Sequence, residues 1–284
     1  MRLSKSALAL GLVGLITVPA WADTGLVFPS NGAGTTRFKF TDPHLNGLPI
    51  YGPGGRGVTY IWKVKHRQQA GYYTTFFWAN DQGQTTSGPG SDSYYGPHPY
   101  PQNPPNGNTH FWEIALDGDW VNGTVTYEVW HTQALRVWSD GSPGNKHHEF
   151  YWDLPNTDAS HRVIRVPNSP TWGDTLPPVP TLTWGDAPWN PGSELCSCTI
   201  RGIQIYNNLL SLVDIQNEIN SPLSTVAGSA SIWYLNLNPT PTDISDKSGK
   251  SHNPVWVGSN RPTLYDDGGG DITPPAAPTN LRIQ

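Results

Sequence analysis

Residues 147–157, HHEFYWDLPNT, are the stretch that points most directly to a fold class. Side chains of an extended strand point alternately to its two faces. This alternation places polar or ionisable side chains on one face, namely His147, Glu149, Tyr151 and Asp153. The opposite face carries the apolar Phe150, Trp152 and Leu154. A strand with one polar and one apolar face is expected to be half buried against a core.

The same two-residue period recurs along most of the chain, between clusters of Gly, Pro, Asn and Asp. Strands are expected at residues 35–40, 58–68, 72–80, 110–116, 125–139, 148–154, 161–166 and 198–207. Many short alternating segments separated by turn residues are typical of a β-sandwich. Residues 211–219 have instead the spacing of a short helix, with Leu212, Ile215 and Ile219 on one side. The pattern therefore predicts an all-β fold with one helix.

The last strand and the helix carry a resemblance to a known superfamily. Residues 200–219, IRGIQIYNNLLSLVDIQNEI, are similar to the closing strand and following helix of laminin-G-like, concanavalin A-like jelly rolls. The match rests on Ile200, Ile203, Ile205, Tyr206, Asn207, Leu210 and Ser211. Residues 232–258 are similar, more weakly, to the opening strand and Asp-x-Ser-Gly turn of the same domains. The resemblance implies a jelly-roll sandwich of two antiparallel sheets, in a superfamily of lectins and glucanases.

The first 22 residues have the build of a cleaved secretory signal. Two basic residues precede an apolar run at residues 7–18, and cleavage is expected after Ala22, so the protein should be secreted. No other stretch of the sequence approaches the ~20 apolar residues of a membrane-spanning helix.

The rest of the chain is expected to form one domain and a tail. Residues 23–262 would make the jelly roll, with residues 232–258 adding a strand to it, and residues 263–284 a Gly- and Pro-rich tail. With 17 Lys and Arg against 22 Asp and Glu, the net charge is −5. Nucleic acids and anionic membranes attract basic patches, so neither is an expected partner.

Cys196 and Cys198 are the two cysteines of the chain. They would share one face of a strand, but a disulfide across so short a loop is strained, whereas exported proteins commonly form disulfides. The sequence is therefore compatible with either a local disulfide or two reduced thiols. Further ligands at zinc-binding spacing do not follow them.

Paired carboxylates would indicate a glycoside hydrolase, a class that the resembled superfamily includes. Such pairs lie about 5 Å apart in retaining enzymes and roughly 6.5 to 9.5 Å apart in inverting ones. Glu149 and Asp153 are four positions apart on one strand, which is about 13 Å. Glu113 and Asp117 have the same spacing. Hydrolysis would therefore need a carboxylate pair formed between strands.

A polysaccharide lyase would need a Tyr or His as base and an Arg, Gln or Asn to neutralise a uronate carboxylate. Residues of suitable type are His131 and Gln133 on one expected strand and Glu149 and Tyr151 on another. These four are the candidate catalytic residues, provided that the two strands lie side by side. The strand motifs of known jelly-roll lyases are absent from the sequence.

Two long loops rich in Pro and Gly are expected at residues 84–108 and 167–195, and long loops in compact domains are commonly functional. Sugars stack their C–H faces on aromatic rings and direct their hydroxyls to polar groups. The candidate substrate-binding residues are Tyr94, Tyr95, His98, Tyr100, Trp172, Trp184 and Trp189. Each loop Trp could equally cap an open end of the core.

Calcium is a common structural ion of the resembled sandwiches. Asp117 and Asp119 are the candidate metal ligands, and Asp243 and Asp246 lie in a second oxygen-rich turn of the kind that calcium prefers. Turn formation alone would account for the same residues.

These observations lead to one expected function and two alternatives. We expect a secreted protein that binds a polysaccharide or another glycan through loop aromatics and a polar strand face. A polysaccharide lyase or glycoside hydrolase on the same scaffold is the first alternative, and a structural or adhesive surface module is the second. The fold alone does not decide among them.

Overall fold

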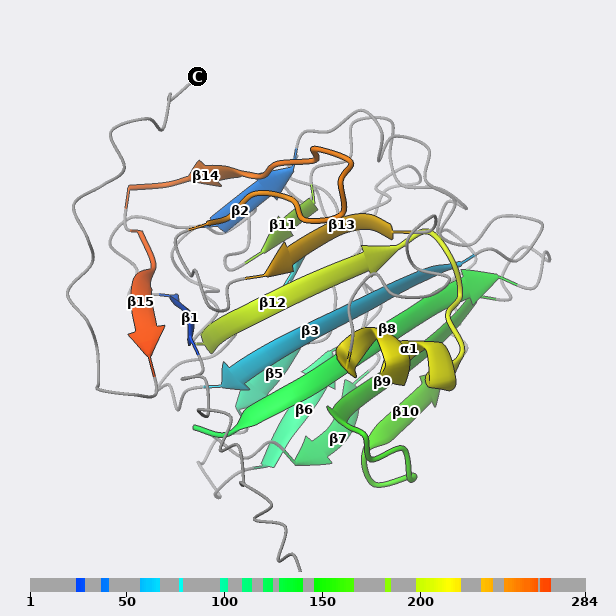
Figure 1. Cartoon of the computed structure of the whole chain (residues 1–284). Helices are drawn as coiled ribbons and strands as arrows, with labels where there is room; N and C mark the ends of the chain where they lie inside the picture. Colours follow the sequence, from blue (N-terminus) through cyan, green and yellow to red (C-terminus); the bar gives the residue numbers. More distant parts are fainter. Residues whose placement is uncertain are drawn as a thin grey trace, which may run out of the picture.

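Strand β3 (Val58–His66) lies at the centre of an antiparallel sheet that organises the chain (Figure 1). The structure, a computed structural model, describes residues 24–28, 37–40, 57–66, 77–78, 98–101, 109–113, 120–124, 128–139, 146–165, 182–184, 198–220, 231–236, 243–259 and 261–266. The other strands of this sheet are β1 (Thr24–Val27), β8 (Trp130–Ser139), β9 (Lys146–Leu154), β10 (Arg162–Arg165), β12 (Cys198–Tyr206), β13 (Ser231–Asn236) and β15 (Thr263–Asp266). Their order is β10-β9-β8-β3-β12-β1-β15, and β13 also pairs with β12.

Two smaller antiparallel sheets complete the described strands. One has the order β14 (Val255–Val257), β2 (Arg37–Phe40), β11 (Leu182–Trp184) and β4 (Phe77–Trp78), and the other β5 (His98–Pro101), β6 (Thr109–Glu113) and β7 (Trp120–Thr124). Figure 1 shows β5, β6 and β7 behind the large sheet, on the side opposite the helix α1 (Leu212–Asn220). The predicted all-β class is confirmed. The described strands form three hydrogen-bonded sheets.

The predicted central strands are largely confirmed. The strands expected at 58–68, 148–154 and 198–207 correspond to β3, β9 and β12, with ends that differ by no more than two residues. The strand expected at 125–139 begins only at Trp130. Glu128, before it, has a φ of 59° and donates its N–H to the His66 carbonyl at 2.8 Å. A positive φ turns the chain, so Glu128 does not continue the strand.

One face of the large sheet, here called the inner face, carries most of the large apolar side chains. Strand register puts Tyr60 opposite Leu135 and opposite Ile205, and all three are buried. The rings of Trp62 and Phe150 stack with centroids 6.0 Å apart and planes inclined by 10°. Burial of an aromatic or aliphatic side chain stabilises the fold by about 1.5–3 kcal/mol, so this face is a main source of stability.

The opposite face, here called the helix face, is partly covered by α1, which lies across β8 and β9 in Figure 1. Ile215 of the helix packs in one cluster with Ile61, Ala134 and Tyr206 of the sheet. Leu212 and Ile219 pack against the same cluster, as the helical spacing predicts. The Tyr206 hydroxyl donates to the buried Glu218 carboxylate at 3.0 Å, which provides a polar contact between sheet and helix.

The sheet extends beyond the expected end of the domain. The tail was expected from residue 263, but Thr263–Asp266 is β15 and pairs with β1 along its length. Leu264 in its middle is buried, so a short segment inside the expected tail contributes to the sheet. The segment 232–258 does add a strand, since β13 pairs with β12.

Cys198, at the start of β12, is buried and disulfide-bonded. Cys196, the other cysteine of the chain, lies outside the described residues. Within the described part of the chain, no helix has the length and apolar character needed to cross a membrane.

Candidate functional site

A β-bulge between β8 and β9 decides which side chains meet on the inner face. Ala134 pairs with Tyr151 and Thr132 pairs with Leu154, so two residues of β9 lie opposite the single residue Gln133. An extra residue reverses the alternation of side chains beyond it. Asp153 therefore lies on the inner face beside His131, and not on the face of Tyr151.

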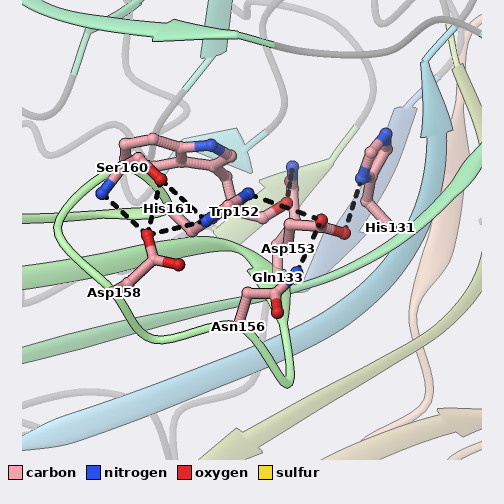
Figure 2. A network of polar contacts seen from close by, with 8 residues as sticks. All are labelled: His131, Gln133, Trp152, Asp153, Asn156, Asp158, Ser160 and His161. Atoms are coloured by element: carbon pink, nitrogen blue, oxygen red, sulfur yellow. Dashed lines mark hydrogen bonds and ion pairs between the residues drawn. The ribbon is translucent and has the colours of Figure 1, made fainter.

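Asp153 is the centre of a polar network at this end of the sheet (Figure 2). One carboxylate oxygen lies 3.0 Å from His131 Nδ1. The other accepts a hydrogen bond of 3.2 Å from the Asn156 side chain and lies 4.0 Å from His161 Nε2. The His131 side chain is 8% exposed and that of Asp153 is 35% exposed, so the pair connects the interior with the surface.

The turn after β9 continues this network outward. Asp158 accepts hydrogen bonds from the Ser160 backbone and hydroxyl, and it lies 2.8 Å from His161 Nδ1. The hydrogen bond from the Ser160 hydroxyl first, and then the one from His161, lower the pKa of Asp158 to about 2. Carboxylates and imidazoles thus alternate in the order Asp158, His161, Asp153 and His131, from the exposed turn toward the interior.

The Ser160, His161 and Asp158 side chains contain the groups of a hydrolase triad, but their geometry is that of a turn. The Ser160 hydroxyl donates directly to Asp158 at 2.5 Å, and the same Nδ1 of His161 faces both partners. In a triad the histidine bridges nucleophile and carboxylate through its two different nitrogens. An Asp accepting from the residue two positions later is a common turn motif.

Gln133, a predicted catalytic residue, is buried, and its side chain links several residues of the inner face by hydrogen bonds. Its amide oxygen accepts from the Trp62 indole N–H at 2.8 Å, and an indole nitrogen is a donor only. Its amide nitrogen therefore donates, to the Trp152 carbonyl at 3.3 Å and to His66 Nε2 at 3.2 Å. It follows that His66 Nε2 is unprotonated while this bond exists. Gln133 uses its oxygen and its nitrogen in structural hydrogen bonds.

Glu149 and Tyr151, also predicted as catalytic, lie on the helix face. Arg136 forms an ion pair with Glu149, and both side chains are about 15% exposed. The Tyr151 hydroxyl donates to the same carboxylate at 3.1 Å. Burial first, and then the negative charge of Glu149, raise the pKa of the Tyr151 phenol.

The four predicted catalytic residues therefore do not form one site. Strands β8 and β9 do lie side by side, as that hypothesis required. However, Glu149 lies opposite Arg136, whereas His131 and Gln133 project from the other face. The expected distance between Glu149 and Asp153 along one face also does not apply, because the bulge puts the two carboxylates on opposite faces.

A second cluster lies on the helix face, here called the lysine–aromatic patch: Lys63, Lys65, Trp130 and Tyr265. The Trp130 and Tyr265 rings meet edge to face, with centroids 5.9 Å apart and planes at 75°. The Lys65 ammonium lies 4.2 Å from the Tyr265 ring and 5.3 Å from the Trp130 ring, and it donates to the Tyr265 hydroxyl. The Lys63 ammonium lies 5.8 Å from Trp130.

The arrangement of four strands makes this patch possible. Tyr265 on β15 and Lys65 on β3 are separated by β1 and β12, or about 14 Å at ordinary strand spacing. Tyr265 is paired with Gly25, which has no side chain, so the Tyr265 side chain can extend over β1 toward Lys65. Thr199 of β12, opposite Lys65, is 1% exposed, consistent with cover by the patch. Lys63, Trp130 and Tyr265 themselves are half-buried.

The predicted loop residues are placed only in part. Tyr94, Tyr95, Trp172 and Trp189 lie outside the described residues. His98 and Tyr100 lie in β5, and Trp184 lies in β11, so these three are strand residues and not loop residues as expected. Among the strands that the structure describes, β5 pairs only with β6, and such an edge position tolerates its prolines, Pro99 and Pro101.

The metal candidates Asp117 and Asp119 also lie outside the described residues. Within the described ranges, no group of three or more His, Cys, Asp or Glu side chains is arranged to hold a metal ion. Asp243 accepts from Ser245 and Lys247, and Asp246 accepts from Ser248 and from the His252 backbone. Both carboxylates are thus engaged by protein donors within their own turn.

The lysine–aromatic patch was not among the sites predicted from the sequence. A signal for the lysines was present, because Lys63 and Lys65 occupy alternate positions of a largely apolar strand and so share a face. Tyr265 carried no such signal, since it lay in the expected tail. Its role depends on the pairing of β15 with β1.

No family model and no curated protein matches this chain. Among solved structures it is similar to full-length tailspike protein 2 from Escherichia coli O157:H7 bacteriophage CAB120, with 17% identity, a TM-score of 0.42, and 82% of this chain and 31% of that chain covered. It is also similar to the CBM40 domain of the Ruminococcus gnavus IT-sialidase, solved with α2,3-sialyllactose. The identity is 14%, the TM-score is 0.37, and the match covers 67% of this chain and 94% of that chain. A third similar structure is domain 4 of the arabinanase AbnA from Geobacillus stearothermophilus, solved with arabinotriose. The identity is 12%, the TM-score is 0.32, and the match covers 69% of this chain and 98% of that chain.

The chain spans about a third of the length of the tailspike protein that it matches. All three TM-scores lie below 0.5, so these likenesses do not identify a family or a function.

Proposed function

We propose that the protein is secreted and binds a polysaccharide without transforming it, through the helix face of its large sheet. The observation that carries this proposal is the pair of half-buried rings, Trp130 and Tyr265, held edge to face beside two lysines. An aromatic surface next to polar groups suits the C–H faces and hydroxyls of a sugar.

The position of the patch on the sheet supports this role. The helix α1 packs over Ile61 and Ala134, whereas Lys65 and Trp130 lie four residues further along the same two strands. At about 3.3 Å per residue this is roughly 13 Å, enough to place the patch beside the helix and not under it. An extended polymer can lie on a sheet surface that is bordered by a helix.

The described carboxylates give less support to hydrolysis. Retaining and inverting glycosidases need two cooperating carboxyl groups. Glu149 is paired with Arg136 on the helix face, while Asp153 is bound to His131 on the inner face. The raised pKa of Tyr151 also makes its phenol a poorer base at neutral pH, which weakens the lyase reading for that residue.

Affinity gel electrophoresis on a panel of neutral and acidic polysaccharides tests this proposal, with matched assays for product. Trp130→Ala should weaken binding at least tenfold. Trp138→Ala is the matched control, because Trp138 is half-buried, lies on the same face of the same strand and also contacts a cation, Arg136. Equal effects of the two variants, or binding to none of the panel, would contradict the proposal; the latter result would favour the adhesive module.

One observation favours a second candidate, a polysaccharide lyase. His131 is buried, and Asp153 lies at hydrogen-bond distance from its Nδ1, an arrangement that orients an imidazole to act as a base through its other nitrogen. In this case a uronate polysaccharide should yield an unsaturated product that absorbs near 235 nm. His131→Ala should abolish that product, while Trp138→Ala should leave it unchanged. Binding without product in the wild type would exclude this candidate for the polymers tested.

A further inference from the structure

We infer that the lysine–aromatic patch is completed by docking of the short strand β15, so that polysaccharide binding and docking of this strand favour each other. This inference rests on the proposed function and adds how the binding surface is controlled. It starts from the strands that supply the four side chains. Lys63, Lys65 and Trp130 come from β3 and β8, whereas Tyr265 comes from β15.

The strands on the two sides of the patch differ in length and in position. Strands β3 and β8 have nine and ten residues, pair along eight positions and lie inside the large sheet. Strand β15 has four residues and, among the strands that the structure describes, pairs only with β1, which is equally short. Local opening costs less free energy where a segment has few buried apolar contacts than in the core strands. The Tyr265 side of the patch is therefore expected to open more readily than the Trp130 side.

Contacts on both faces of the sheet hold β15 in place. Leu264 is 9% exposed and, by strand alternation, projects to the inner face. On the helix face the Tyr265 ring meets the Trp130 ring, and the Lys65 ammonium lies 4.2 Å from the Tyr265 ring. The contacts of Tyr265 thus anchor the strand and form the proposed binding surface at the same time.

This double role couples the strand to the ligand. Undocking of β15 would carry Tyr265 away from Trp130, so a polysaccharide that contacts both rings would bind the docked state more tightly. A ligand shifts an equilibrium toward the state that it binds better. In the same way, the apparent affinity falls in proportion to the docked fraction. A change at Leu264, on the face opposite Tyr265, should therefore weaken binding without touching the patch.

Hydrogen–deuterium exchange followed by mass spectrometry tests the opening of β15 without any ligand. The backbone amides of Thr263–Asp266 should exchange at least tenfold faster than those of β3 and β8. Trp130→Ala removes the ring against which Tyr265 packs, so it should accelerate exchange in β15 at least threefold further. Trp138→Ala keeps that contact and should leave exchange in β15 unchanged. Exchange in wild-type β15 as slow as in β3 would overturn the inference, whether or not the protein binds a polysaccharide.

The effect of a ligand is measured with dextran, laminarin, hydroxyethylcellulose and polygalacturonate as soluble probes. A bound probe should slow exchange in β15 at least threefold, and the effect should grow with its free concentration, because exchange then requires an open state that binds the probe poorly. Strand β10, at the other end of the described strand order, is the control and should not respond.

Leu264→Ala should weaken binding of the same probe at least threefold in isothermal titration calorimetry. Leu212→Ala is the matched control, because Leu212 is a half-buried leucine that packs in the cluster under α1 and not on β15. It should leave the affinity unchanged. Circular dichroism would verify that both variants fold, and the exchange measurements on the wild type do not depend on them.

The outcomes separate the inference from the proposed function. Binding that neither slows exchange in β15 nor responds to Leu264→Ala would overturn the inference and leave polysaccharide binding intact. Binding of none of the four probes would count against both. Protection confined to β15, together with weaker binding by Leu264→Ala and unchanged binding by Leu212→Ala, would establish the coupling.

Discussion

Asp153 lies 3.0 Å from His131 because β9 contains one more residue than β8 between their paired positions Tyr151–Ala134 and Leu154–Thr132. Without the extra residue Asp153 would pair with Thr132 and would project to the helix face. The bulge therefore creates the polar network of Figure 2 and, in the same step, directs Leu154 toward the cluster under α1.

Removal of the Asp153 carboxylate should destabilise the fold. Asp153→Ala removes a hydrogen-bond partner of the buried His131 side chain, and loss of a hydrogen bond to a charged group costs about 1–3 kcal/mol. Urea unfolding monitored by tryptophan fluorescence would measure this change. Asn156→Ala, which removes only one exposed bond to the same carboxylate, should cost less than about 0.5 kcal/mol. A larger loss for Asn156→Ala would contradict this account.

Local patterns in the sequence predicted local structure well. Phe150 and Trp152 were expected in the core and are 0% and 4% exposed. The helix was expected from its periodicity, and Ile215 is buried as that periodicity requires. These features depend on residues close in sequence, so an alternating or helical pattern contains the information needed to find them.

Features that depend on pairing between strands were not predictable. No glycine or other marker signals the bulge at Trp152 and Asp153, so the alternation appeared to continue through Asp153. The pairing of Glu149 with Arg136, and the contact of Tyr265 with Lys65, depend on register and strand order. A single sequence specifies neither the register nor the strand order directly. For this reason the predicted catalytic set combined residues that lie on opposite faces of the sheet.

Ser211 should contribute to the stability of α1 through a capping box. Its hydroxyl accepts from the Asp214 backbone at 3.1 Å, while the Asp214 carboxylate accepts from the Ser211 backbone at 3.3 Å. Ser211→Ala should lower the free energy of unfolding by about 1 kcal/mol. Val213→Ala is a control in the same turn, since Val213 is 70% exposed, and it should change stability by less than about 0.5 kcal/mol. Thermal denaturation followed by circular dichroism would compare them.

Gln133 should be required for the packing of the inner face. Gln133→Met has a similar shape, but it leaves the buried Trp62 indole N–H and the Trp152 carbonyl without this partner. Each such loss costs about 1–3 kcal/mol, so a total of at least about 2 kcal/mol is expected. Gln216→Met on the half-buried surface of α1 should be nearly neutral. Urea titration would test both, and a neutral Gln133→Met would show that these bonds contribute little.

Gly25 should be required both for strand pairing and for the lysine–aromatic patch. A Cβ at this position would lie 2.6 Å from the Ile200 carbonyl oxygen, a backbone atom that cannot move aside without separating β1 from β12. Gly25→Ala should cost about 1–3 kcal/mol of stability. Because Tyr265 is paired with Gly25, the variant should also weaken polysaccharide binding. Gly249→Ala, where no atom lies within 4 Å, should affect stability through its φ of 80° and leave binding unchanged.

Asp243 should make stability depend on pH in the acid range. Hydrogen bonds from Lys247 and then from Ser245 lower its pKa from the ordinary value of 3.8 to about 2. A lowered pKa means that folding favours the charged carboxylate, so its contribution is complete above about pH 4 and is lost as the pH falls through about 2. The side chain is 42% exposed, so salt should reduce the effect.

Comparison of the wild type with Asp243→Asn tests this dependence. The wild type should be more stable at pH 6, and the difference in urea midpoint should shrink steadily between pH 4 and pH 2. Lys247→Gln removes the strongest donor, so in that variant the carboxylate should lose its contribution at a higher pH than in the wild type. A difference between wild type and Asp243→Asn that stays constant from pH 6 to pH 2 would show that the Asp243 charge does not stabilise this turn.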